Sequence, residues 1–101
     1  MKITKLVRDR IPELVEKNKQ QAQFHIADKE EYFQHLKQKL QEEVSEFLED
    51  NTVEELVDII EVLYALAEYK NTSQHQLETL RKKKADERGI FSKRLIIEYD
   101  K

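Results

Sequence analysis

The sequence contains no cysteine and no tryptophan, and it has only one glycine and one proline among its 101 residues. Without cysteine, the chain cannot form disulfides or bind a metal through thiolates. A turn-rich β fold needs glycine and proline between its short strands, so their scarcity argues against that fold class. Glutamate, lysine, glutamine and leucine are abundant instead, and all four favour helices. This composition predicts an all-α protein.

The chain also lacks a surplus of positive charge and a long apolar run. It has 18 basic against 21 acidic residues and a sequence pI near 5.7, so we expect no nucleic-acid partner. No stretch is long enough to span a membrane, and residues 1–8 lack the apolar core of a signal peptide. We therefore expect a cytoplasmic protein with no membrane partner. The length limits it to a single domain, residues 1–101.

Apolar periodicity and capping residues predict four helices. The first covers about residues 11–20, with Pro12 in its first turn. A polar N-cap residue followed three positions later by Glu or Gln, which is a candidate capping box, precedes each of the other three: Asp28 with Glu31, Thr52 with Glu55, and Ser73 with Gln76. The second helix should end near Asp50 and the fourth near Glu87, with Gly89 just beyond. Residues 95–99 are expected to form a short β-like tail.

The second and third helices are joined by only a few residues, so they should lie side by side as an antiparallel hairpin. The third helix carries apolar side chains around a wide part of its circumference. A face that wide contacts more than one neighbour. We therefore expect a hairpin core of about four helices that assembles into an oligomeric helical bundle.

Two acidic pairs lie on the predicted hairpin, one on each helix: Glu43 with Glu46, and Glu55 with Asp58. At 3.6 residues per turn, the first member of each pair lies about 70° from the centre of its apolar stripe and the second about 130°, in the same rotational sense. In an antiparallel pair, equal displacements place all four acids on one side. Because four clustered acids repel one another, a hard divalent cation with oxygen ligands, such as Mg²⁺, would relieve the repulsion.

A solvated charged face is the alternative interpretation, since a chain with 21 acidic residues contains many such pairs by composition. Glu55 also has a structural use as the partner of Thr52 in a capping box. Further acids lie nearby and leave open which carboxylates bind a cation: Glu42, Glu49, Asp50, Glu54 and Glu61.

The spacing ExxE and ExxD across a helical hairpin resembles the signature of the all-α nucleoside triphosphate pyrophosphohydrolases, the superfamily of MazG-like and phosphoribosyl-ATP pyrophosphohydrolase-like enzymes. Residues 40–47 (LQEEVSEF) and 54–58 (EELVD) carry this resemblance. Residues 5–13 (KLVRDRIPE) are similar to the N-terminal motif of one MazG-like subgroup, and residues 84–91 (KADERGIF) to its C-terminal motif. Ile90 departs from that motif, which often has a second glycine there. The resemblance spans most of the chain.

The resemblance implies a helical homodimer or homotetramer that hydrolyses a nucleotide substrate to its monophosphate and pyrophosphate. It implies that Glu43, Glu46, Glu55 and Asp58 hold Mg²⁺, with Mn²⁺ as an alternative ion. Glu43 and Glu46 are the carboxylates that we expect to be catalytic. Cations must also bind the phosphates, and the candidates are Arg8, Lys84 and Arg88.

Other interpretations remain open at this point. Arg8 and Asp9 would form a local ion pair if Arg8 had no role at the site. The lysines at 82–84 would be a solvated helix end, where positive charge suits the helix dipole. The function alternatives are phosphoribosyl-ATP hydrolysis and a non-catalytic helical module that acts through its apolar faces.

Overall fold

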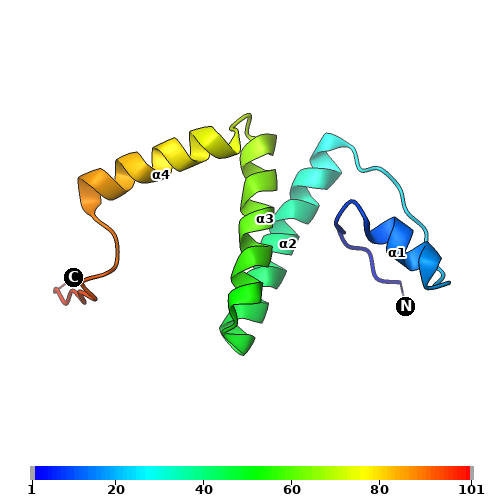
Figure 1. Ribbon diagram of the computed structural model, residues 1–101, viewed down its shortest axis with the longest axis horizontal. Coiled ribbons are helices and arrows are strands. Elements are labelled where there is room, and N and C mark those ends of the chain that lie inside the picture. Colours follow the sequence, from blue (N-terminus) through cyan, green and yellow to red (C-terminus); the bar gives the residue numbers. More distant parts are fainter. Residues whose placement is uncertain (1, 101) are drawn as a thin grey trace.

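The structure, a computed structural model, describes residues 2–100. Its four helices are α1 (Ile11–Lys17), α2 (Lys29–Asp50), α3 (Val53–Tyr69) and α4 (Gln74–Arg88) (Figure 1). Residues 2–100 contain no strand. The predicted all-α class is therefore confirmed.

Helices α2 and α3 form the predicted antiparallel hairpin, which is the main helix–helix interface of the chain (Figure 1). Only Asn51 and Thr52 separate them. Asn51 adopts the left-handed conformation, with φ of 59°, and its N–H donates to the Phe47 carbonyl. Asparagine tolerates this conformation better than most residues. Asn51 thus ends α2, and the two-residue turn that it begins reverses the chain direction.

The core of the hairpin is small. Leu36, which is 1% exposed, and Val62, which is 8% exposed, are the buried apolar side chains of the described residues. Farther from the turn, the Phe33 and Tyr69 rings stack with centroids 4.6 Å apart, and Tyr32 meets Tyr69 edge-on at 6.2 Å. These tyrosines therefore pack at the helix interface.

The helix starts agree with two of the three predicted caps. The Asp28 side chain accepts a hydrogen bond from the Glu31 N–H, and Ser73 with Gln76 forms a complete capping box. The box predicted at Thr52 is wrong, because the Thr52 side chain makes no capping hydrogen bond. Glu55 is consequently free for another role.

Both ends of the chain differ from the predicted pattern. Helix α1 ends at Lys17, three residues earlier than expected, and Lys19 has a φ of 56° that no α-helix continues through. The β-like tail at residues 95–99 is not a strand. Its side chains are exposed and no neighbouring strand is present in residues 2–100 to pair with its backbone.

The chain is extended rather than compact. Its radius of gyration is 17.8 Å, whereas a compact domain of this length has about 13 Å. Helix α1 packs against none of the other three helices, and α4 contacts only α3 and points away from the hairpin (Figure 1). No helix in residues 2–100 is both long and apolar enough to cross a membrane.

This arrangement leaves a second apolar stripe on α3 uncovered. Its members recur at helical spacing and are all exposed: Val53, Leu56, Val57, Ile60 and Leu63. Monomeric proteins rarely expose contiguous apolar patches of this kind. The stripe is consistent with the predicted oligomer, which stays a prediction.

We expect the protein to exceed its monomer mass of 12.2 kDa in light scattering at micromolar concentration. Ile60→Asp places a charge in the centre of the stripe and should weaken association about 30-fold, the equivalent of about 2 kcal/mol at a central interface position. Gln34→Asp, at an exposed position of α2, adds the same charge and should leave the mass unchanged. A folded wild-type monomer at these concentrations would refute the prediction.

Candidate acid cluster on the helical hairpin

One acid of each predicted pair lies on the seam between α2 and α3. Glu43 follows Leu36 by seven residues on α2, and Glu55 precedes Val62 by seven residues on α3. Seven residues are close to two helical turns, so each acid projects from nearly the same face as the buried apolar residue. The seam is therefore apolar toward the open end of the hairpin and acidic toward its turn. This placement explains why Glu43 is only 7% exposed.

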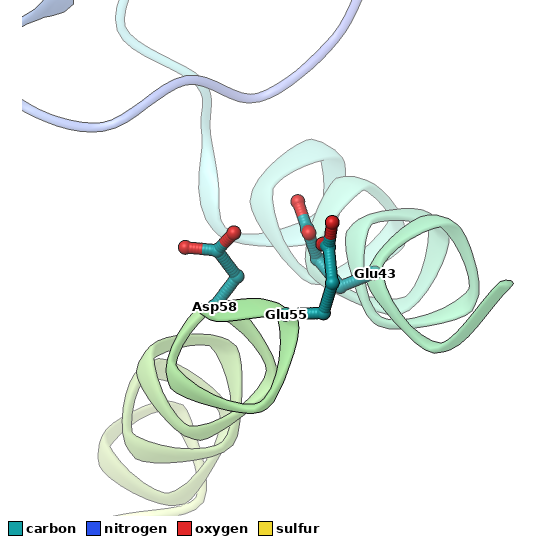
Figure 2. A group of neighbouring side chains, drawn as sticks. All are labelled: Glu43, Glu55 and Asp58. Atoms are coloured by element: carbon teal, nitrogen blue, oxygen red, sulfur yellow. The ribbon is translucent and has the colours of Figure 1, made fainter. Parts of the chain in front are cut away.

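Three of the four predicted acids lie close together. Glu43, Glu55 and Asp58 each offer a carboxylate oxygen, and these oxygens all lie within 4.8 Å of one another (Figure 2). Glu46 is a neighbour of both glutamates, and its negative charge raises the pKa of Glu43 and of Glu55. We call Glu43, Glu46, Glu55 and Asp58 the acid cluster. Glu43, Glu55 and Asp58 thus share one side of the hairpin, and their role in binding a cation stays a prediction.

The electrostatics of the acid cluster reflect burial and mutual repulsion. Burial raises the pKa of the Glu43 carboxyl and the neighbouring Glu46 raises it further, while Lys39 opposes both. Loss of solvent and the charges of Glu46 and Asp50 raise the pKa of Glu55 to about 7, from an ordinary value of 4.5. The charged forms of these carboxylates are thus disfavoured unless another positive charge is supplied.

Two oxygens in the acid cluster show what kind of ligand fits it. Glu43 Oε2 and Glu55 Oε2 are both inaccessible to solvent, and neither has a hydrogen-bond partner. Buried polar atoms are nearly always satisfied, so an orphaned carboxylate oxygen indicates a missing partner. The donors are all carboxylate oxygens, which suit hard cations such as Mg²⁺ and Mn²⁺.

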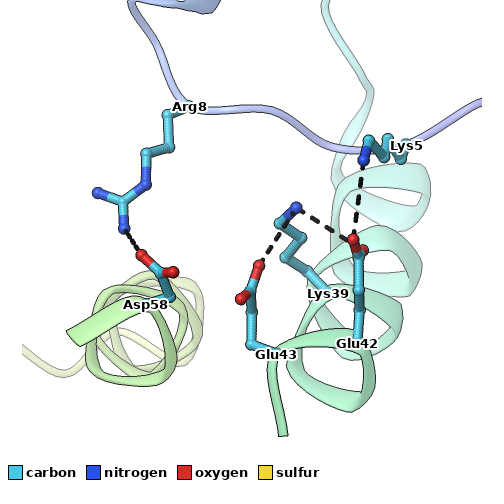
Figure 3. A network of polar contacts seen from close by, with 6 residues as sticks. All are labelled: Lys5, Arg8, Lys39, Glu42, Glu43 and Asp58. Atoms are coloured by element: carbon cyan, nitrogen blue, oxygen red, sulfur yellow. Dashed lines mark hydrogen bonds and ion pairs between the residues drawn. The ribbon is translucent and has the colours of Figure 1, made fainter. Parts of the chain in front are cut away.

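Basic residues border the acid cluster (Figure 3). Arg8 Nη2 donates to Asp58 Oδ1 at 2.9 Å. Lys5 Nζ lies 3.7 Å from Glu42, and Lys39 Nζ lies 3.6 Å from Glu42 and 3.4 Å from Glu43. Arg8, predicted as a phosphate ligand, is thus at the site, and its ion-pair partner is Asp58 rather than Asp9.

Sequence reasoning did not single out Lys5 or Lys39. For Lys39 a signal was available, because a lysine four residues before a glutamate on a helix faces it. Lys5 lies in an irregular segment whose path no periodicity defines.

The other two predicted phosphate ligands are not at the acid cluster. Lys84 and Arg88 lie on α4, which leaves the hairpin at its end opposite the α2–α3 turn and points away from it (Figure 1). Both side chains are exposed. Within one chain, therefore, they do not face the acid cluster.

Comparisons with protein families, with curated proteins and with solved structures find no match for this chain.

The raised pKa of Glu55 predicts a pH dependence of stability. Between pH 4.5 and about 7 the folded state keeps a proton that the unfolded state has released, so the free energy of unfolding should fall as pH rises through this window. Glu55→Gln cannot titrate, and its Tm in EDTA should depend less steeply on pH. The control is Glu54→Gln, because Glu54 is its exposed neighbour. Parallel Tm–pH curves for wild type and Glu55→Gln would contradict this.

Added Mg²⁺ should raise the Tm of the wild type, because a ligand that binds only the folded state stabilises it, by about 2.7 kcal/mol at 100 times its Kd. Glu46→Gln and Asp58→Asn should each reduce that shift. In EDTA, Glu46→Gln should be at least as stable as wild type, since it removes a repelling charge. Asp58→Asn also loses its exposed ion pair with Arg8, which offsets the gain by about 0.2–1 kcal/mol.

The controls for the metal response are Glu49→Gln on α2 and Glu61→Gln on α3. Both residues are exposed and lie outside the acid cluster. A wild-type Mg²⁺ response in both cluster variants would show that Glu46 and Asp58 do not hold the ion and that the proposed site is wrong.

Proposed function

We propose that this protein is a Mg²⁺-dependent nucleoside triphosphate pyrophosphohydrolase that converts an NTP or dNTP to its monophosphate and pyrophosphate. The observation that carries the proposal is the buried carboxylate of Glu43, whose Oε2 has no partner and which faces Glu55 and Asp58. The MazG-like pattern in the sequence supports it, because in that superfamily these positions hold the metal.

The residues of the acid cluster divide the work in this proposal. Glu43, Glu46, Glu55 and Asp58 hold Mg²⁺, or Mn²⁺ in its place. When bound, the ion neutralises phosphate oxygens and acidifies water. The water oxygen attacks the α-phosphorus, its proton passes to a glutamate, and the bond to the pyrophosphate leaving group breaks. We assign the proton to Glu46, since it is partly exposed and passes it on to solvent more readily than the buried Glu43.

Phosphate binding requires cations. Of the three predicted phosphate ligands, Arg8, in the segment before α1, donates a hydrogen bond to a member of the acid cluster. Lys84 and Arg88 lie on α4, which points away from the hairpin of its own chain (Figure 1). We propose that they bind phosphate at the cluster of a second copy, which fits the exposed apolar stripe of α3.

The same exposed stripe is what a non-catalytic helical interaction module would use. Such a module has no need for a buried, unpartnered carboxylate, which costs stability. Phosphoribosyl-ATP hydrolysis uses the same phosphate chemistry and differs in the substrate base and sugar. A substrate panel that includes phosphoribosyl-ATP separates these alternatives.

Incubation with a panel of nucleotides and Mg²⁺ should release pyrophosphate, and the reaction should stop in excess EDTA. Glu46→Gln should lower kcat about 100-fold or more, the usual contribution of a positioned base, with helix content by circular dichroism unchanged. Glu49→Gln should behave as wild type. Orthophosphate as the first product, or full activity in EDTA, would rule out the proposed function.

A further inference from the structure

Residues 2–10, which we call the N-terminal strap, run beside the acid side of the hairpin (Figure 3). Their first seven described residues have no regular secondary structure, and the helix that follows them packs against no other helix. Two ion pairs tie the strap to the hairpin, Lys5 to Glu42 and Arg8 to Asp58. Leu6 and Val7 of the strap are themselves half-buried. The strap is therefore attached at the site by two ion pairs and by the partial burial of two apolar side chains.

The Arg8 contact involves a member of the acid cluster itself. Asp58 accepts from Arg8 at 2.9 Å and also offers an oxygen within 4.8 Å of Glu43 and Glu55. A carboxylate that ligates a divalent cation has its negative charge neutralised, and a guanidinium beside that cation is repelled by it. Arg8 and a cation are thus alternative partners of Asp58.

We infer that Arg8 is an exchangeable counter-ion, an inference that rests on the proposed function. Arg8 neutralises Asp58 until Asp58 ligates a divalent cation, and it then binds phosphate oxygens of the nucleotide. The pair is exposed on both sides, 54% for Arg8 and 42% for Asp58, and exposed pairs change equilibrium constants by no more than about fivefold. The planar guanidinium suits phosphate as well as it suits carboxylate.

Exchange of this kind couples the two ligands of the site. Binding of a cation at Asp58 frees Arg8 for phosphate, and phosphate at Arg8 frees Asp58 for a cation. Because binding free energies are linked, each ligand must raise the affinity for the other by the same factor. Arg8 is then a binding and positioning residue whose effects on metal and on nucleotide have opposite signs.

The first test is calorimetric titration of the nucleotide-free protein with Mg²⁺ alone. Arg8→Gln should bind Mg²⁺ about two- to fivefold more tightly than wild type, because the competitor for Asp58 is gone. Arg10→Gln, which removes the same charge from a residue paired with Glu13 on α1, should bind like wild type. Lys5→Gln controls for long-range charge, since Lys5 pairs with Glu42 outside the cluster, and its effect should be smaller than that of Arg8→Gln.

The second test uses a non-hydrolysable nucleoside triphosphate analogue at saturating Mg²⁺. Arg8→Gln should bind it about tenfold more weakly, as expected for the loss of a charge-assisted hydrogen bond. Tighter metal binding together with weaker nucleotide binding is the signature of exchange. A purely structural Arg8 would weaken both.

The wild-type protein provides a third readout that needs no variant. If Arg8 leaves Asp58 on metal binding, Mg²⁺ should accelerate tryptic cleavage after Arg8, while cleavage after Arg94, in the exposed C-terminal segment, stays the same. Unchanged or weaker Mg²⁺ binding by Arg8→Gln overturns the inference, and so does unchanged or slower cleavage after Arg8 in the presence of Mg²⁺. If the wild type still binds Mg²⁺ and releases pyrophosphate, the proposed function stands. A wild type that does neither overturns the proposed function as well.

Discussion

The carboxylate of Glu43 is buried in the seam between α2 and α3, and the arrangement around it follows from that burial. A glutamate at a core position costs free energy unless its charge is matched. Lys39, four residues earlier on the same helix, supplies part of the match to one oxygen, while the other oxygen has no partner. Facing it across the seam are further carboxylates, Glu55 and Asp58, rather than cations. The hairpin therefore concentrates negative charge where a folded protein would ordinarily place apolar side chains.

This concentration of charge comes at the expense of the core. Leu36 and Val62 are the buried apolar side chains of the described chain, and the positions two turns along from each are acids. A hairpin with so little buried apolar surface gains little hydrophobic stabilisation by itself. Ligand binding at the acid cluster and coverage of the exposed stripe on α3 would both add stability that the isolated chain lacks. The acid cluster and the uncovered stripe thus belong to the same hairpin.

Much of the fold could be predicted from local signals. The Ser73–Gln76 capping box and the periodic stripe of α2 are short-range features, and the structure reproduces both. Thr52 looked equivalent to Ser73 in sequence, yet its side chain makes no cap. Both residues have the extended backbone of an N-cap, so the difference lies in the side-chain hydrogen bonds and not in the backbone conformation.

The acid cluster was predictable in outline. Equal helical displacements predict that both acidic pairs lie on one side of the hairpin, at the edge of its apolar seam. Glu43 is more buried than an edge position implies, at 7% exposed, whereas the Asp58 side chain is 42% exposed. Exposed residues such as Leu56 and Ile60 shift the apparent centre of the α3 stripe away from its buried position. The buried positions, Leu36 and Val62, lie in line with Glu43 and Glu55 and are the better reference. Which apolar residues are buried depends on what covers each face, and a single sequence does not contain that information.

The distribution of positive charge connects the acid cluster to assembly. A triphosphate adds several negative charges to a site that already holds four carboxylates, and the cations nearest to it are Arg8 and Lys39. Lys39 is already paired with two glutamates, Glu42 and Glu43. The other predicted phosphate ligands, Lys84 and Arg88, lie on α4. This helix contacts α3 but not α2 of its own hairpin. A second copy seated on the stripe of α3 would bury apolar surface and bring a helix rich in lysine and arginine toward the hairpin. Oligomerisation would then also serve phosphate binding. The exposed stripe of α3 and the acid cluster belong to the same hairpin, so one neighbouring copy would cover the stripe and supply cations to the cluster.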